Sequence, residues 1–312
     1  MTTYIIRRLL YTIPIMFGVL LLTWTLFVVV GGDVSLEIAG KGATQQTIEE
    51  IREEYGLNKP LFLSSDSQFV NHFKNALTFN FGRARDRELV IDKIKRGLWP
   101  SLALTVPIFL GVVIISVGLS LVIAFVRGTV WDVAAVVICV VGMSVPYLSF
   151  ILFGQYFLAY KWGFFPVFFS PDLNMADNVA LPVLIGIAAG LGGNVRFYRT
   201  VMLDEMQSDY VRTAFAKGLS SRRVLFKHVL KNAMVPIITR VVGAIPFLFL
   251  GSLLLERFFG IPGIGYLMVE AIGARDYFVI SAMTYIGAIL FVVFNLLTDI
   301  CYLLVDPRIR LE

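Results

Sequence analysis

The chain has 312 residues, of which 57% are hydrophobic and 16% charged, with a mean hydropathy of +0.79 and a net charge of +5. This composition excludes an ordinary soluble protein, because the apolar residues gather in runs of about 20, the length that crosses a hydrocarbon core of roughly 30 Å. Cys139 and Cys301 lie inside apolar runs and give neither a disulfide framework nor a metal-binding spacing. No GxxxxGK[ST] sequence occurs, so any ATP that powers the protein binds to another chain.

Six apolar stretches predict an all-α integral membrane protein with about six transmembrane helices. In chain order, the predicted spans are 9–30, 101–126, 132–154, 179–196, 236–255 and 278–304. The first is too long for a signal-peptide core and lacks a clear small-residue cleavage site, so we expect it to remain as an anchor. The polar segment 31–97 follows it, with a helix expected over 47–55.

The distribution of Lys and Arg predicts that both termini face the cytoplasm. An even number of spans puts both termini on one side. That side then carries Arg7, Arg8, Arg127, the nine basic residues from Arg196 to Arg240, Arg308 and Arg310. The short loops of the opposite side carry only Lys161, Arg257 and Arg275. Segment 31–97 is then extracytoplasmic. Because the positive charge follows topology, and the aromatic and basic residues 196–199 fit an interfacial belt, nucleic acid is not an expected partner.

Residues 209–236, DYVRTAFAKGLSSRRVLFKHVLKNAMVP, form a basic stretch with helical periodicity between two apolar runs. Arg223, Lys227 and Lys231 are spaced by four and lie on one helix face. A second face carries Phe226, Leu230, Ala233 and Ile237. Ser220 and Ser221 are candidate N-caps, and Gly218 separates this helix from the one before it. The pattern predicts helix, glycine turn and helix, with the chain entering the membrane at Pro236. An amphipathic loop lying on anionic lipid is the alternative.

The stretch AKGLSSRRVLFKHVLKNAMVP resembles the cytoplasmic loop of ABC importer permeases, in the version carried by the dipeptide/oligopeptide branch of binding-protein-dependent type I transporters. In that family the loop forms a coupling helix that fits into a groove on the ATPase subunit. The resemblance covers nearly the whole chain, because YIIRRLLYTIPIMFGV, IEEIREEYGLNKPL, ERFFGIPGIGYLMVEAIGARDY and NLLTDICYLLVDPRIRL resemble further family segments in the same order. Two departures are Arg212-Thr213-Ala214 in place of Glu-Ala-Ala, and Gly31-Gly32-Asp33 in place of Pro-Gly-Asp.

The resemblance implies a permease subunit in a prokaryotic cytoplasmic (inner) membrane, which forms half of a pathway for peptides or related small solutes. The implied organisation is a transmembrane helix at 1–30, an extracytoplasmic segment at 31–97, a type I transmembrane domain at 98–305 and a cytoplasmic tail at 306–312. The coupling loop at 197–235 belongs to the transmembrane domain. The residues assigned to coupling are Asp209, Tyr210, Arg212, Ala214, Ala216, Lys217, Gly218, Arg222, Arg223, Lys227, His228, Asn232 and Pro236.

The implied partners are a second homologous permease, two ATP-binding subunits, an extracytoplasmic solute-binding protein and membrane lipid. ATP and Mg belong to the ATP-binding subunits, so this chain is expected to bind no cofactor and to be no enzyme. His72 and His228, the only histidines, have no Cys, His or carboxylate at metal-ligand spacing, so no catalytic or metal-binding residue is predicted. The branch includes carriers of dipeptides, oligopeptides, nickel complexes and some sugars, and the binding protein selects among solutes.

Two other places carry pathway hypotheses. Pro262, Gly263 and Gly265 in ERFFGIPGIGY preclude a simple helix and favour a re-entrant turn, which either lines a gate or is a crowded external turn. Asn295 and Asp299 lie four apart on one face of the last span, where polar groups usually face protein or water. We expect a helix-packing pair there. The alternative is an ion site in a self-contained secondary transporter, with Asp299 as its carboxylate.

Overall fold

The computed structural model describes residues 2–30, 34–39, 43–54, 56–62, 64 and 66–305. These residues are helical almost throughout, with one isolated antiparallel bridge between Arg83 and Leu89 among them, so the predicted all-α class is confirmed. The helices are α1 Thr2–Trp24 with the π-helical turn η1 Thr25–Val30, α2 Val34–Ala39, α3 Gln45–Glu54, α4 Gln68–Leu77, α5 Val90–Phe125, α6 Val130–Ser144, α7 Tyr147–Gly154 with η2 Gln155–Lys161, α8 Met175–Met206, α9 Asp209–Ala216, α10 Ser221–Val224 with η3 Leu225–Val229, α11 Leu230–Leu250, α12 Leu253–Phe259, α13 Ile264–Ala274 and α14 Tyr277–Val305.

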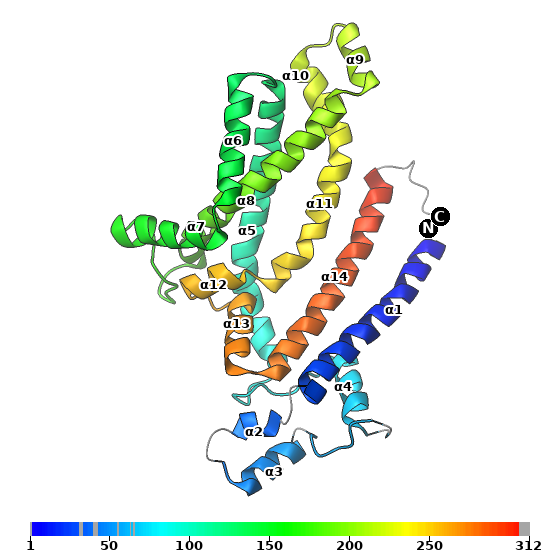
Figure 1. Cartoon of the computed structure of the whole chain (residues 1–312), viewed down its shortest axis with the longest axis vertical. Coiled ribbons are helices and arrows are strands. Elements are labelled where there is room, and N and C mark those ends of the chain that lie inside the picture. The colour runs from blue at the N-terminus through cyan, green and yellow to red at the C-terminus, as the bar shows by residue number, and fades with distance from the viewer. Residues whose placement is uncertain are drawn as a thin grey trace.

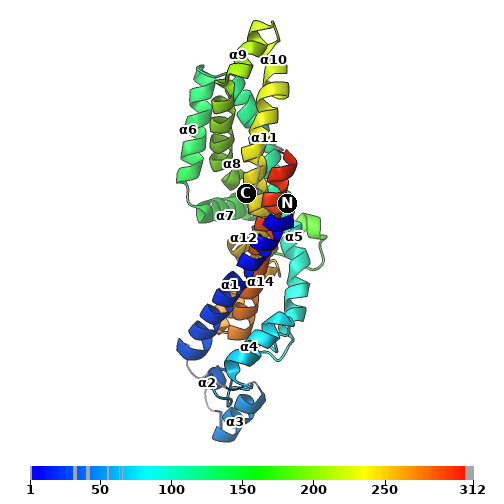
Figure 2. The same cartoon turned by 90° about the vertical axis from the view of Figure 1, so that its right-hand side faces the viewer.

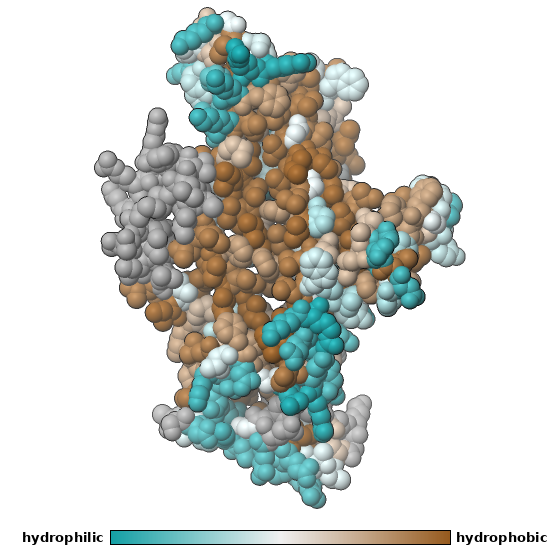
Figure 3. Space-filling view, turned by 180° about the vertical axis from the view of Figure 1, so that it is seen from behind, coloured by the Kyte–Doolittle hydropathy of each residue, from teal (hydrophilic) through white to brown (hydrophobic). Residues whose placement is uncertain are grey.

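The molecule is elongated, with short polar helices at its two ends (Figure 1). Helices α5, α6, α8 and α11 form one bundle, and α1 runs antiparallel beside α14 (Figures 1 and 2). Helices α9 and α10 lie at one end, whereas α2, α3 and α4 lie at the other. The surface seen from behind carries a broad hydrophobic belt between hydrophilic ends (Figure 3). Apolar side chains exposed in such a belt are those of a membrane-embedded surface.

The predicted spans agree with the helices only in part. Four described stretches are long and apolar enough to cross a membrane, namely Val90–Phe125, Met175–Met206, Ser221–Phe259 and Tyr277–Thr298, and the bent pair Val130–Ser144 and Tyr147–Lys161 would make a fifth. The apolar part of α1, Leu10–Trp24, is shorter than the others. The number six therefore stays a prediction. The expected helix over 47–55 is confirmed as far as residue 54, since α3 covers Gln45–Glu54, and residue 55 lies outside the described residues.

The predicted span over 132–154 coincides with a bent pair of helices and is not one continuous helix. Helix α6 ends at Ser144, and the following helix turns away from it by 89°. The cause is Pro146, which has no backbone N–H and pushes the residue before it out of the helical region. Val145 accordingly adopts φ −79° and ψ 123°. The predicted span 236–255 lies within the apolar stretch Ser221–Phe259, which has a break after Leu250, where Gly251 takes φ +73°.

Small residues let the central helices approach closely. An added Cβ at Gly190 would lie 2.8 Å from a methyl of Val112, and one at Gly192 would lie 2.8 Å from the carbonyl oxygen of Cys139. These two glycines of α8 therefore allow close helix packing. A partly buried ion pair adds to the contact of α8 with α6, because Arg199 donates to Asp132 through Nε at 2.8 Å and Nη2 at 2.9 Å.

Candidate functional site

The coupling segment, which we define as residues 209–232, lies beyond the ends of the long helices (Figures 1 and 2). Helix α9 is followed by Gly218 at φ +76°, and α10 begins at Ser221. A residue without a Cβ fits this left-handed conformation at no steric cost, so the predicted glycine turn is confirmed. Ser220 occupies the N-cap position in an extended conformation, as predicted, but its side chain makes no capping hydrogen bond.

The inner side of the coupling segment is apolar and packs on the bundle. Val211 and Ala214 of α9, together with Val224, Leu225 and Val229, join a buried cluster. That cluster also contains Leu121 of α5, Tyr198 and Met202 of α8, and Ala233 and Ile237 of α11. The segment therefore shares one continuous core with three long helices.

One residue of the predicted apolar face points elsewhere. Phe226 is 63% exposed, whereas Leu225 and Val229 are buried. A period of four that starts at Leu225 continues through Ala233 and Ile237. The prediction placed Phe226 on the buried face, but Leu225, the residue before it, occupies that position. The π-helical turn Leu225–Val229 changes the rotation per residue in the middle of the pattern.

The outer side of the segment is polar and cationic. Of the residues assigned to coupling, those exposed are Asp209, Arg212, Ala216, Lys217, Gly218, Arg222, Arg223, Lys227 and Asn232; those half-buried are Tyr210, His228 and Pro236; and Ala214 is buried. Within the described residues, the one ion pair of this segment joins Arg212 to Asp209 at 3.5 Å, on the surface. Arg222, Arg223 and Lys227 thus present their charges outward without an acidic partner in the described part of the chain.

Tyr210 connects the segment to its neighbours through polar contacts. Its hydroxyl donates to the Glu205 carboxylate at the end of α8, and Asn232 of α11 also hydrogen-bonds to it. The pKa of the phenol is raised, first by burial and then by the hydrogen bond to the Glu205 carboxylate. The hydroxyl therefore keeps its proton at neutral pH and holds α9 against α8 and α11.

Pro236 does not interrupt the path from the coupling segment into the bundle. Helical backbone continues from Ser221 through the π-helical turn to Leu250, with Pro236 inside α11. No loop therefore separates Ser221 from Leu250 in this described stretch.

A second site, which sequence reasoning missed, surrounds the carboxylate of Glu256. This side chain is 0% exposed. Ser101 Oγ on α5 donates to Glu256 Oε1 at 2.8 Å, the Ser252 N–H donates to the same oxygen at 2.9 Å, and the Tyr266 N–H donates to Oε2 at 2.9 Å. Ser101 Oγ in turn accepts from the Ile264 N–H at 2.7 Å. We call this the Glu256 junction. A carboxylate within an apolar stretch, beside a glycine-rich turn, was the signal in the sequence that could have found it.

The glycines of ERFFGIPGIGY belong to the wall of this junction. Gly263 and Gly265 are buried, whereas Pro262 is exposed. Gly263 is the N-cap residue of α13, and Gly265 lies in the first turn of that helix, not in the turn before it. A Cβ on Gly265 would approach the Ser252 carbonyl carbon and the Leu253 nitrogen to 2.8 Å. The geometry favours the crowded turn for both glycines, and a gate-lining role stays a prediction.

The five predicted pathway residues do not form one site. Gly263 and Gly265 lie before the start of α14, whereas Asn295 lies 18 residues into it, about 27 Å along a helix. Asn295 is half-buried, and the side chain of Asp299 lies outside what the structure describes. Among the described residues, no three or more His, Cys, Asp or Glu side chains gather at a metal-binding distance.

Comparison with known proteins gives matches over the whole length. Residues 116–311 match the family described as "Binding-protein-dependent transport system inner membrane component", and residues 1–85 match "Binding-prot-dependent transport system membrane comp, N-term". The oligopeptide transport system permease protein AppB of Bacillus subtilis (strain 168) is 35% identical over 99% of this chain and 100% of its own length.

Two further relatives cover the chain equally well. The probable peptide ABC transporter permease protein y4tP of Sinorhizobium fredii (strain NBRC 101917 / NGR234) is 36% identical over 99% of this chain and 100% of its own length. The glutathione transport system permease protein GsiC of Escherichia coli (strain K12) is 33% identical over 99% of each chain.

Proposed function

Because the chain belongs to the family of binding-protein-dependent transport system inner membrane components, we propose that it couples ATP hydrolysis by separate subunits to the import of peptides or related small solutes. In this proposal it forms half of the translocation pathway in the inner membrane. A second homologous permease forms the other half, two ATP-binding subunits hold ATP and Mg, and an extracytoplasmic solute-binding protein delivers the solute. The relatives are named as permeases of transport systems, which favours this function over a secondary transporter built on Asp299.

The observation that carries the coupling proposal is the two-sided character of the coupling segment. Its inner side is packed into the core shared by α5, α8 and α11, whereas Arg222, Arg223 and Lys227 face outward without acidic partners among the described residues. Rigid attachment on one side and unpaired charge on the other suit a surface that docks on a partner and transmits its movement. An acidic groove on an ATP-binding subunit is the complementary surface.

The proposed orientation has the coupling segment and both termini in the cytoplasm. Helix α1 begins and α14 ends on the side toward α9 and α10, whereas α2, α3 and α4 occupy the opposite end (Figure 1). This arrangement supports the extracytoplasmic assignment of 31–97, with the membrane-spanning helix 1–30, the transmembrane domain 98–305 and the tail 306–312 as the remaining divisions. The peptide substrate is proposed from the relatives, whose names specify oligopeptides, peptides and glutathione.

The experiment that tests this function is purification of the chain under gentle detergent extraction, with identification of the proteins that accompany it. We expect a second permease and one or two ATP-binding subunits in stoichiometric amounts. A chain that purifies alone or only with itself, and whose solute uptake is abolished by an uncoupler, would contradict the proposal and support the secondary transporter.

A further inference from the structure

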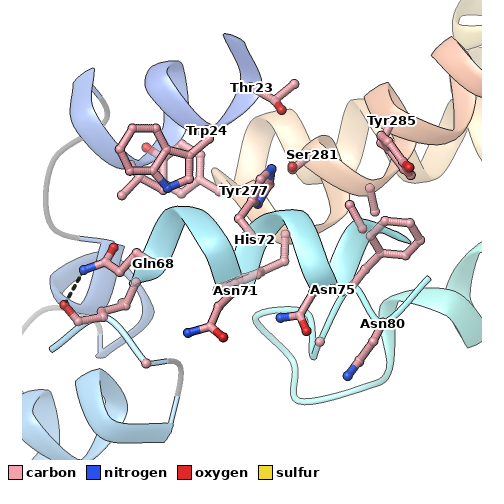
Figure 4. Close-up of a pocket in the computed structure, with 18 of the residues that line it drawn as sticks. Thr23, Trp24, Gln68, Asn71, His72, Asn75, Asn80, Tyr277, Ser281 and Tyr285 are labelled. Carbon is pink, nitrogen blue, oxygen red and sulfur yellow. Dashed lines mark hydrogen bonds between the residues drawn. The ribbon is translucent and has the colours of Figure 1, made fainter. Parts of the chain in front are cut away.

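A cavity of about 570 Å³ opens at the end of the molecule opposite the coupling segment. Its walls come from the end of α1, one side of α4, the chain around 80–83 and the start of α14, so segments distant in sequence enclose it (Figure 4). This volume is in the range of pockets that hold small molecules. Neither the coupling segment nor the Glu256 junction contributes to it.

Two buried polar atoms in this wall have no hydrogen-bond partner among the described residues. One is Trp24 Nε1, on a side chain that is 1% exposed, and the other is His72 Nε2. In Figure 4 the imidazole of His72 points from α4 toward Thr23 of α1 and Ser281 of α14. The hydroxyl of Thr23 is already used, because it donates to backbone carbonyls of its own helix. A buried polar atom without a partner is rare and destabilising, so the Trp24 N–H donor and His72 Nε2, which donates or accepts according to the tautomer, indicate a missing ligand.

Three charged side chains line the cavity, those of Glu53, Lys59 and Arg83. Lys59 pairs with Asp66 at 2.7 Å, and Arg83 Nη1 donates to the Arg87 carbonyl at 2.9 Å. Burial lowers the pKa of His72, so its ring is neutral at pH 7. Arg83 has no acidic partner among the described residues, but the carboxylate of Glu53 in the same lining offsets its charge, so the cavity has no excess of cations to favour a phosphate or a carboxylate.

The remaining polar groups are neutral and carry both donors and acceptors. The carboxamides of Asn75 and Asn80 and the hydroxyl of Ser281 line the cavity and make no side-chain hydrogen bond to the described residues. A carboxamide presents one donor and one acceptor side by side, as a peptide group does. Phe81 and Tyr285 add aromatic surface, with ring centroids 6.1 Å apart.

We propose that this cavity binds a short, uncharged stretch of peptide backbone, with the indole N–H of Trp24 donating to a peptide carbonyl and the ring of His72 bonding to a neighbouring peptide group. This inference rests on the proposed function, because it assigns peptide as the ligand. It adds a binding site on the extracytoplasmic side of the permease chain itself, separate from the translocation pathway and from the coupling segment.

The test measures binding of N-acetyl-trialanine amide, which has peptide groups but no charged ends, to the full chain in lipid nanodiscs by calorimetry. Maltose serves as a neutral ligand of a different chemistry. We expect the peptide to bind and maltose not to bind. Trp24→Phe keeps the ring and removes the donor, so it should weaken binding about fivefold, the effect of one hydrogen bond. Trp131→Phe, which changes a 75% exposed tryptophan on α6, should leave binding unchanged.

A second measurement keeps the test decisive if Trp24→Phe does not fold. With the exposed Trp99, Trp131 and Trp162 replaced by Phe, the remaining fluorescence comes from Trp24 and should change when the peptide is added. Absence of peptide binding, binding of maltose in its place, or equal binding by Trp24→Phe and Trp131→Phe would overturn the inference. If the chain still purifies with ATP-binding subunits in that case, the proposed function stands and only this site fails.

Discussion

The Glu256 junction and the coupling segment satisfy their polar groups in opposite ways. At the junction, a buried carboxylate accepts from three donors within the chain, and no part of it faces solvent. In the coupling segment, the outward charges of Arg222, Arg223 and Lys227 have no acidic partner among the described residues. Gly251 and Gly218 have nearly the same backbone, at φ +73° and +76°, yet a Cβ would be crowded at the first and meet open space at the second.

The polar groups of the Glu256 junction bind one another within the chain, whereas the outward charges of the coupling segment are available to bind a partner. The junction ties α5 to the α12–α13 turn, so substitutions there should act on folding. The outer side chains of the coupling segment contribute little to the free energy of unfolding, so substitutions there should act on assembly and transport. The predictions below test this division.

The largest effect is expected for Glu256→Ala. The change leaves the Ser101 hydroxyl and the Ser252 and Tyr266 N–H groups buried without an acceptor. Each unsatisfied group costs about 1–3 kcal/mol, so the free energy of unfolding should fall by at least ~3 kcal/mol. Unfolding in detergent, followed by circular dichroism, measures this. Glu270→Ala on the exposed side of α13 is the matched control, and equal midpoints for the two variants would show that the junction is not a stabilising element.

A smaller loss is expected for Gly265→Ala. The new methyl would meet the backbone of Ser252 and Leu253 at 2.8 Å, and backbone atoms cannot move aside cheaply. Overpacking of this kind costs about 1–3 kcal/mol. Gly273→Ala in the same helix adds its methyl to open space and should leave the unfolding midpoint unchanged or slightly higher. Equal unfolding midpoints for Gly265→Ala and Gly273→Ala would contradict this prediction.

Arg223→Glu should reverse the pattern, with stability preserved and assembly lost. The side chain is exposed, so the free energy of unfolding should change by less than about 0.5 kcal/mol. Placing an acidic residue against a complementary acidic groove should reduce co-purification of ATP-binding subunits at least tenfold. Lys95→Glu makes the same charge change on the exposed surface of segment 31–97 and should retain the partners. Equal recovery of ATP-binding subunits with both variants would count against docking at Arg223.

The smallest effect concerns pH and His72. Burial lowers the pKa of this imidazole in the folded chain below that of the unfolded chain, so the unfolded chain binds the proton more tightly. Stability from this source is complete at neutral pH and falls as pH drops below about 6.5, the ordinary histidine value. His72→Asn should show a weaker decrease in melting temperature between pH 7 and pH 5 than the unchanged chain. Identical slopes for the two would contradict the assignment.

Local sequence patterns predicted the features that depend on neighbouring residues. The apolar runs located α5, α8, α11 and α14, and the position of Gly218 predicted the turn that its left-handed backbone makes. Patterns did not predict the features that depend on distant residues. Ser101 and Glu256 are 155 positions apart, and nothing in either stretch alone specifies their hydrogen bond. Pro146 explains the break at Val145, but its local sequence does not specify the 89° turn of the helix that follows.

The most direct test of coupling compares uptake with ATP hydrolysis in proteoliposomes that contain the chain and its co-purified partners. Gly218→Val strains a left-handed backbone between α9 and α10, whereas Gly163→Val imposes the same kind of strain, at φ +66° and also in open space, far from the coupling segment. We predict that Gly218→Val retains ATP hydrolysis but loses most peptide uptake, while Gly163→Val keeps the ratio of the two. Unchanged uptake per ATP hydrolysed in Gly218→Val would contradict the claim that the coupling segment transmits movement into the bundle.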